Sequence, residues 1–341
     1  MEGRLRLVFK SHEEKLINEC FERLGIKEKS VPILKMVHGG SGAMVAELFL
    51  QDRKMILKYT SSDAGVELYR NAQRERRFYK YGASQINIQS PTVVAEFEDS
   101  SFGIGLLMRS YQQTPHPSEW GHHLIIQSLT QISKLHAMFW GKDQEIYRIT
   151  GEATFQPKFE YQQDEVAKSI EAWGHVYSIK NLDEFAITCK DNIMQLMRNL
   201  ELLESFQAGH PSTLIHGDFH MENCLLDEKK EVMIVDWQSP KAGAGAEDVG
   251  NFLARAELYG NPLSANEYIT LYKQLLKNQL HVSVPLDEID QICHAKRLLL
   301  HLFWSPRYVL YYPDHVFIRV LEAIQESSLA LGIHMGSGSS K

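Results

Sequence analysis

Three polar residues in the second half of the chain have the types and spacing of a catalytic loop. Asp218 and Asn223 lie five residues apart, in a polar loop that leads into the short apolar segment 224–226. The polar turn 227–231 then joins this segment to a second apolar run that ends just before Asp236. Such a turn closes a β-hairpin, so we expect Asn223 and Asp236 to face one point in space. A carboxylate and an amide oxygen suit Mg²⁺, and a second carboxylate nearby suits a base or a group that orients a hydroxyl.

The same loop must be compared with other kinds of site. The spacing D-x-x-x-x-N, with a further Asp after an apolar strand, matches the template for phosphoryl transfer. His216 and His220 lie four residues apart, as zinc ligands on a helix do, but Gly217 and Asp218 separate them and no H-E-x-x-H glutamate is present. No G-x-S-x-G motif supports a serine hydrolase. The joint pattern therefore favours phosphoryl transfer over a metallohydrolase, and over a surface loop that carries Asp and Asn by chance.

The first 110 residues have the pattern of a small antiparallel sheet. Alternating and β-branched segments predict strands, which are separated by short polar turns. The predicted strands are 31–37, 43–50, 55–59, 92–97 and 102–109, the last two forming a hairpin around 98–101. The amphipathic segment 64–81 predicts a helix between the third and fourth strands. The predicted order is therefore βββαββ.

After the proline-containing stretch 113–117 the pattern changes to long helices. Apolar residues at helical spacing predict helices at 118–140, 159–178, 182–207, 247–258, 264–280, 287–304 and 313–331. We therefore expect an α+β chain with a boundary near 110–117, a small sheet lobe at 1–112 and a larger helical lobe at 113–333. The Gly- and Ser-rich residues 334–341 are expected to form a flexible tail.

The loop motif and its surroundings resemble a known family. The residues that carry the resemblance are His216-Gly217-Asp218-Phe219-His220-x-x-Asn223-x-Leu225, with Asp236-Trp237 downstream. They are similar to the aminoglycoside phosphotransferase/choline kinase-like family, over residues 30 to 330. Leu135-His136-Ala137, Phe139-Trp140 and Asp236-Trp237-Gln238 further resemble its ecdysteroid-kinase-like branch. The resemblance implies a bilobal, protein-kinase-like fold whose N-terminal lobe binds ATP.

The resemblance also implies roles for single residues. Asp218 would be the catalytic base, and Asn223 and Asp236 would hold Mg²⁺. Asp248, near the start of the predicted helix at 247–258, would have a structural capping role.

A lysine and a glutamate in the sheet lobe complete the set of charged residues expected in a kinase-like site. Lys58 ends an apolar strand and would reach the nucleotide phosphates, held by a carboxylate on the following helix. Glu75 is the best candidate for that carboxylate, with Glu67 in reserve. The alternative is that these are ordinary solvated charges, as most Lys and Glu residues are.

Two further segments of the sheet lobe are candidates for nucleotide contacts. Gly39, Gly40, Ser41 and Gly42 join two strands, and their backbone N–H groups could cover phosphates. Val45 stands where the fuller kinase pattern has another glycine, so a plain hairpin turn remains an alternative. Ser110 and Tyr111, in the connector after the last strand, are expected to lie against the adenine.

Several aromatic residues near the end of the chain could concern the acceptor. Trp304, Tyr308, Tyr311, Tyr312 and Phe317 should mostly be core or helix-packing residues. A minority could line a substrate pocket, with a cation–π cage as one alternative.

Composition limits the class of partner and the location. The 341 residues include 36 Lys and Arg and 43 Asp and Glu, a net charge of −7 that argues against a nucleic-acid partner. The four cysteines are far apart and are expected to be reduced and mostly buried. No signal peptide and no run of 18 apolar residues is found, so we expect a cytoplasmic protein with no membrane partner.

Together these observations predict an ATP- and Mg²⁺-dependent kinase that phosphorylates a hydroxyl group of a small molecule. The alternative is a catalytically idle nucleotide-binding or regulatory protein on the same fold. The acceptor stays open, because a net charge of −7 is too small to demand a cationic substrate.

Overall fold

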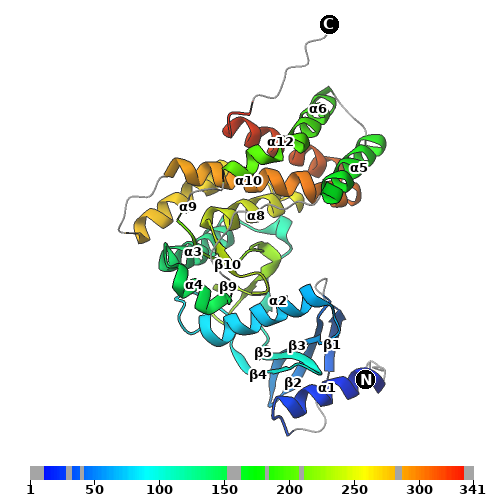
Figure 1. Ribbon diagram of the computed structural model, residues 1–341, viewed down its shortest axis with the longest axis vertical. Helices are drawn as coiled ribbons and strands as arrows, with labels where there is room; N and C mark the ends of the chain where they lie inside the picture. The colour runs from blue at the N-terminus through cyan, green and yellow to red at the C-terminus, as the bar shows by residue number, and fades with distance from the viewer. Residues whose placement is uncertain are drawn as a thin grey trace, which may run out of the picture. The chain divides into compact units, whose positions relative to one another are not determined.

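The computed structural model describes residues 11–27, 33–38, 42–151, 163–180, 184–206, 211–280 and 286–333. The chain divides into two compact units (Figure 1). The sheet unit comprises Met1–Ser84 and Ser90–Tyr111, and the helical unit comprises Gln85–Gln89 and Gln112–Lys341. A five-stranded antiparallel sheet and a larger helical region confirm the predicted α+β class.

The sheet unit contains the predicted order of strands and helix. Its strands are β1 (Ile33–His38), β2 (Met44–Leu50), β3 (Arg53–Ser61), β4 (Val93–Asp99) and β5 (Gly103–Arg109). They pair antiparallel in the order β1-β2-β3-β5-β4. Along β2, the side chains of Met44, Ala46, Leu48 and Leu50 alternate with more exposed residues, because successive side chains of a strand point to opposite faces.

The helix α1 (Ser11–Arg23) was not predicted from the sequence. Its apolar stripe is short, with Ile17, Cys20 and Phe21 at helical spacing inside a charged segment. These three residues are buried in one cluster with the inner side chains of the sheet. Packing against the sheet therefore stabilises a helix that local pattern alone indicates weakly.

The helix between β3 and β4 is shorter than the predicted 64–81. α2 runs from Val66 to Arg77, after Gly65 with its φ of +98°. The chain then widens into a π-helical turn at Phe78–Gly82, in which the N–H of Ala83 donates to the carbonyl of Phe78. Burial of Phe78 and Tyr79 accompanies this widened turn.

The helical unit contains most of the predicted helices. Its helices are α3 (His122–Phe139), α4 (Asp143–Thr150), α5 (Gln163–Ile179), α6 (Glu184–Arg198), α7 (Leu200–Ser205), α8 (Gly245–Leu258), α9 (Ala265–Gln279), α10 (Leu286–Phe303), α11 (Ser305–Tyr308) and α12 (Asp314–Ala330). The helix α4 was not predicted, and the single helix expected at 182–207 is divided into α6 and α7. Short strands complete the unit: β6 (Gln112–Gln113), β7 (Thr213–Ile215), β8 (Cys224–Leu226), β9 (Val232–Ile234) and β10 (Lys241–Gly243).

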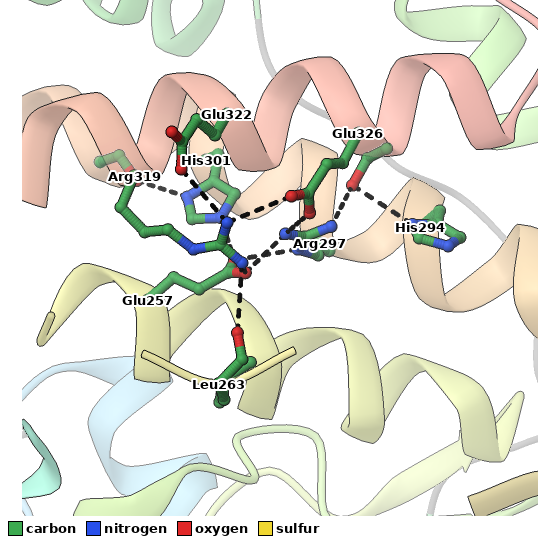
Figure 2. Close-up of polar contacts among 10 residues, drawn as sticks. Glu257, Leu263, His294, Arg297, His301, Arg319, Glu322 and Glu326 are labelled. Atoms are coloured by element: carbon green, nitrogen blue, oxygen red, sulfur yellow. Dashed lines mark hydrogen bonds and ion pairs between the residues drawn. The ribbon is translucent and has the colours of Figure 1, made fainter. Parts of the chain in front are cut away.

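A buried ion network joins α8, α10 and α12 (Figure 2). Glu257 accepts hydrogen bonds from Arg297 Nη2 at 2.5 Å, His301 Nε2 at 2.9 Å and Arg319 Nη2 at 3.1 Å. Arg297 also donates to Glu326 at 2.8 Å. Burial alone would raise the pKa of Glu257, but the charge of Arg297 and the bonds from His301 and Arg297 lower it to about 2. The buried carboxylate is therefore ionised and paired, and it fixes the packing of the three helices.

The aromatic residues near the end of the chain, predicted to be mostly core or helix-packing residues, differ widely in burial. Phe317 lies in the core, but Trp304 is 43% exposed, Tyr308 36% and Tyr311 85%. The short helix α11 follows directly after Trp304.

The cysteines agree with the expectation that they are reduced and mostly buried. All four cysteines are free and buried, as predicted. Among the described residues, no helix is both long and apolar enough to cross a membrane.

Candidate active site

The predicted catalytic loop begins directly after the buried strand β7, in the helical unit. Its second residue, Gly217, has a φ of +81°. A Cβ atom at this position would lie 2.2 Å from the carbonyl oxygen of Ser239. Only glycine therefore fits, because it tolerates both the left-handed conformation and the close approach of the backbone.

His216 holds the shape of this loop through backbone hydrogen bonds. Its Nε2 donates to the carbonyl of Val235 at 2.9 Å. Because a carbonyl can only accept, Nδ1 is left to accept from the backbone N–H of Asp218 at 3.3 Å. The histidine side chain is buried and ties the loop to the segment that precedes Asp236.

The structural capping role expected for Asp248 at the start of its helix is wrong. Asp248 lies four residues into α8, whose first turn is closed instead by Glu247, which accepts from the N–H of Ala244 at 3.0 Å. The carboxylate of Asp248 accepts from the backbone N–H groups of His216 at 2.7 Å and Gly217 at 2.9 Å. Asp248 therefore fixes the catalytic loop rather than the helix end.

His136, on α3, supports Asp248 from the other side. Its Nε2 lies 3.2 Å from the Asp248 carboxylate, and its Nδ1 lies 2.8 Å from the Tyr272 hydroxyl. Gly245 makes room for this pair, since a Cβ there would lie 2.7 Å from both His136 Nδ1 and the Tyr272 hydroxyl. Burial would raise the pKa of Asp248, but the bond from His136 and the nearby charge lower it, so the carboxylate is ionised.

Asp218 is an exposed carboxylate of the loop. Its side chain is 56% exposed, whereas the neighbouring Phe219 is fully buried against Phe252. Desolvation acts to raise the pKa of Asp218, but hydrogen bonding to His220 and the positive charge of that residue lower it to about 2. Asp218 is therefore ionised at neutral pH, and an ionised carboxylate can accept a hydrogen bond from a hydroxyl group.

The side chain of Asn223 is hydrogen-bonded to Asp218. Its Nδ2 donates to the backbone carbonyl of Asp218 at 2.9 Å and lies 3.4 Å from the Asp218 carboxylate. The amide nitrogen is thus used inside the loop, which leaves the amide oxygen as the group suited to a cation.

The predicted hairpin brings Asn223 and Asp236 to the same end of two strands. β8 and β9 pair antiparallel, with Cys224 opposite Ile234. One residue beyond this pair, the N–H of Val235 donates to the carbonyl of Asn223 at 2.9 Å. Asp236 follows with a φ of +64°, a left-handed conformation that is uncommon outside glycine and clusters at functional sites.

In the sheet unit, Lys58 and Glu75 form an ion pair. Lys58 Nζ lies 2.7 Å from Glu75 Oε2, and the two side chains are 13% and 2% exposed. A buried carboxylate of this kind is stable only when it is paired. Glu67, the reserve candidate, lies in the first turn of α2.

The structure describes only some of the other residues of the sheet unit that were candidates for nucleotide contacts. Gly39, Gly40 and Ser41 lie outside the described residues. Gly42 has a φ of +70°, as a turn requires. In the connector, Ser110 donates to Glu47 at 3.3 Å, and the Tyr111 hydroxyl accepts from the N–H of Thr92 at 3.1 Å.

Sequence reasoning missed a polar chain that leads from Asp218 to the end of α8. His220 Nε2 lies 3.6 Å from Asp218 Oδ2, and its Nδ1 lies 3.8 Å from Glu222 Oε2. Glu222 in turn accepts from Arg255 Nη2 at 3.1 Å and from the Tyr259 hydroxyl. Arg255 and Tyr259 lie four residues apart on one helix face, but no local pattern indicates that this face meets the loop.

Comparisons with known proteins give a consistent result. The sequence model of a phosphotransferase enzyme family matches residues 39–281. A comparison with curated proteins finds no significant match.

Among solved structures, a microcompartment-associated aminopropanol kinase has a TM-score of 0.61 at 13% identity, covering 94% of this chain and 99% of that one. An ethanolamine kinase from Plasmodium vivax has a TM-score of 0.57 at 12% identity, covering 93% of this chain and 87% of that one. A choline kinase from Streptococcus pneumoniae has a TM-score of 0.51 at 15% identity, covering 95% and 100% of the two chains. At these identities the likeness concerns the fold.

Proposed function

The chain belongs to the phosphotransferase enzyme family, and on that basis we propose that it is a kinase that transfers the γ-phosphoryl group of ATP to a hydroxyl group of a small molecule. The observation that carries this proposal is the construction of the loop around Asp218. Two backbone N–H groups are held by a buried carboxylate, Gly217 has no room for a side chain, and the carboxylate of Asp218 that follows directly is 56% exposed. The main contribution of a protein to phosphoryl transfer is the rigid positioning of charged groups.

In this proposal Asp218 orients the acceptor hydroxyl and receives its proton. A carboxyl group whose pKa lies near 2 is a weak base. It therefore acts first by accepting a hydrogen bond that aligns the hydroxyl oxygen, and the proton moves as the oxygen–phosphorus bond forms.

The donor set at the hairpin fits a magnesium ion. The amide oxygen of Asn223 and the carboxylate of Asp236 are hard oxygen donors, and the nitrogen of the Asn223 amide is already bound to Asp218. When bound, Mg²⁺ would neutralise negative charge on the phosphate oxygens.

Lys58 is proposed to bind the nucleotide phosphates, with Glu75 as its positioning partner. The pair at 2.7 Å keeps the lysine extended and charged. We further propose that Gly40, Ser41 and Gly42 contribute to the phosphate contacts and that Ser110 and Tyr111 contact the adenine. Assignment to the ecdysteroid-kinase-like branch also stays a prediction.

The test is an ATP-consumption screen against a library of hydroxyl compounds, paired with a nucleotide thermal-shift assay. We expect Mg²⁺-dependent stabilisation by ATP and ADP release with at least one class of acceptor. Nucleotide binding without transfer across a broad panel would instead support the idle, regulatory alternative.

A further inference from the structure

One face of α8 binds the catalytic loop at several points. Asp248 accepts from the backbone at the start of the loop, and three residues later Asn251 donates to the carbonyl of Phe219 at 3.0 Å. A turn further along, Arg255 donates to Glu222 at 3.1 Å. Spacings of three and four residues put these side chains on the same helix face. The helix therefore fixes the position of Glu222 as well as the start of the loop.

Glu222 is held by two side chains of α8. Its Oε2 accepts from Arg255 Nη2 and from the Tyr259 hydroxyl. Arg255 Nη2 also donates to the Tyr259 oxygen at 3.1 Å, so that each of the three groups contacts the other two. These contacts restrict the carboxylate of Glu222, although its side chain is 48% exposed.

The imidazole ring of His220 lies between the carboxylates of Glu222 and Asp218. Nε2 lies 3.6 Å from Asp218 Oδ2, Nδ1 lies 3.8 Å from Glu222 Oε2, and the side chain is 8% exposed. In the part of the chain that the structure describes, the buried Nδ1 has no hydrogen-bond partner. Buried polar atoms are normally bonded, so an exception in a catalytic loop calls for a functional explanation. The two carboxylates that the ring faces provide one.

The two carboxylate oxygens of Asp218 have different surroundings. Asn223 Nδ2 lies 3.4 Å from Oδ2, and His220 Nε2 lies 3.6 Å from the same oxygen. No hydrogen bond or ion pair from the described residues reaches Oδ1. Donors that converge on one oxygen restrict the rotation of a carboxylate, and they leave the other oxygen available to a ligand.

We propose that His220 is a positioning residue, which holds Asp218 Oδ2 so that Oδ1 accepts the hydrogen bond of the acceptor hydroxyl. Glu222, fixed by Arg255 and Tyr259, holds the ring of His220 in turn. The inference rests on the proposed function for the role of Asp218, and it adds residues that the proposed function does not use. Catalytic hydrogen bonds are often long in a free enzyme and shorten when the substrate binds, and the contact of 3.6 Å is suited to such a change.

The kinetic test compares three replacements of His220. His220→Leu removes both ring nitrogens, His220→Gln carries an amide N–H about as far from the backbone as Nε2, and His220→Asn carries one only as far as Nδ1. ADP release from ATP and Mg²⁺ is measured with the fastest acceptor of the hydroxyl-compound screen. We expect kcat to fall about 10- to 100-fold in the Leu and Asn variants and to stay within roughly threefold of the parent in the Gln variant. The KM for ATP should be unchanged in all three, because Asp218 is proposed to contact the acceptor.

Two further comparisons separate positioning from a structural role. His294→Leu is the matched control, because His294 is also a buried histidine but bonds to Ser327 between α10 and α12. It should lower the stability and leave kcat unchanged. Adding His220→Leu to Asp218→Asn should lower kcat less than about twofold further, since residues that act as a unit are not additive.

A structural measurement does not depend on any acceptor. Crystal structures of the full chain are compared for the parent, His220→Gln and His220→Leu. We expect one orientation of the Asp218 carboxylate in the parent and in the Gln variant. In the Leu variant the carboxylate should rotate or occupy two orientations, because only Asn223 still contacts Oδ2.

The outcomes separate this inference from the proposed function. Parent-like kcat in His220→Leu, equal losses in the Gln and Asn variants, or a kcat loss of the same size in His294→Leu would overturn the inference. An unchanged Asp218 carboxylate in the Leu variant would overturn it as well. If His220→Leu does not fold, the comparison of Gln with Asn, in turnover and in crystal structures, decides. Absence of transfer by the parent to every acceptor would contradict the kinase, and the crystal structures would then decide on the role of His220.

Discussion

Asp218 shows how neighbouring groups can fix both the charge and the orientation of one carboxylate. It is exposed enough to meet a substrate, yet the hydrogen bond and the charge of His220 keep its pKa near 2. Its charge is therefore constant over the neutral range, and its orientation is restricted by Asn223. The catalytic contribution expected from it is thus positional as well as electrostatic.

Replacing Asp218 by Asn tests that contribution. Asp218→Asn keeps the size and removes the charge, so we expect kcat to fall by about 10²- to 10⁴-fold. Nucleotide affinity should be unchanged, which calorimetry with ATP and Mg²⁺ measures alongside turnover. A variant within a few-fold of the parent kcat would remove Asp218 from this role.

The Lys58–Glu75 pair gives a second prediction at this scale. Lys58→Met should raise the KM for ATP and lower kcat, because the phosphates lose their cation. Adding Glu75→Gln should cost little more, since residues that act as a unit are not additive. The double-mutant cycle is measured by steady-state kinetics, with Lys54→Met, an exposed lysine on the same strand, as the control. Fully additive losses would mean that the two residues act independently.

The two hairpin ligands should differ in importance if they hold Mg²⁺. Asp236→Ala removes a charge, whereas Asn223→Ala removes a dipole, so the Asp236 variant should lose more activity. Excess Mg²⁺ should rescue Asn223→Ala more readily. The measurement is kcat against Mg²⁺ concentration at saturating ATP. Wild-type activity and Mg²⁺ dependence in Asp236→Ala would contradict this assignment of the hairpin.

At the scale of elements, the loop is held by helices that are remote from it in sequence. The carboxylate of Asp248 on α8 binds two N–H groups of the loop, and His136 on α3 binds that carboxylate. Three segments are thus joined at one buried ion, which is stable because both of its oxygens are bound by donors. The same buried carboxylate therefore holds the loop rigid and joins α3 to α8.

Removing this ion should destabilise the protein strongly. Asp248→Ala leaves the buried N–H groups of His216 and Gly217 without partners, so we expect a loss of about 3 kcal/mol in the free energy of unfolding. Denaturant titration measures it. Asp227→Ala is the control, because Asp227 also accepts two backbone N–H groups but lies in the exposed hairpin turn. A loss no larger than that of the control would argue against the role given to Asp248.

At the scale of the whole molecule, burial of titratable groups between helices makes stability depend on pH. Burial between α10 and α12, together with the charge of Arg297, lowers the pKa of His294 to about 4. The unfolded chain then binds a proton more readily than the folded one between about pH 6.5 and 4. The contribution of neutral His294 to the free energy of unfolding is therefore fully present above about pH 6.5, and it is lost as the pH falls from about 6.5 to 4.

His294→Gln should remove this part of the acid sensitivity. The difference in unfolding free energy between the parent and His294→Gln should change by about 3 kcal/mol from pH 7 to pH 4, in favour of the variant at low pH. Urea titrations across that range measure it. His175→Gln, at an exposed position on α5, should leave the pH profile unchanged. Parallel profiles for the parent and His294→Gln would contradict the pKa shift.

The local sequence pattern by itself determined those parts of the protein in which the contacting residues are close together in the sequence. The strands of the sheet unit, the hairpin at 224–234 and the spacing of Asp218, Asn223 and Asp236 follow from alternation, turn chemistry and a few consecutive residues. These interactions are decided within one or two elements, so the residue order is sufficient to predict them.

Only the tertiary structure decided which distant groups share a site. Asp248 and His136 are 112 residues apart, and α1 is stabilised by a sheet that begins after it. The exposure of Trp304 and Tyr308 likewise depends on which helix covers them. Burial, pairing of buried charge and solvent exposure are properties of packing between elements, and periodicity along one segment contains no information on its neighbour.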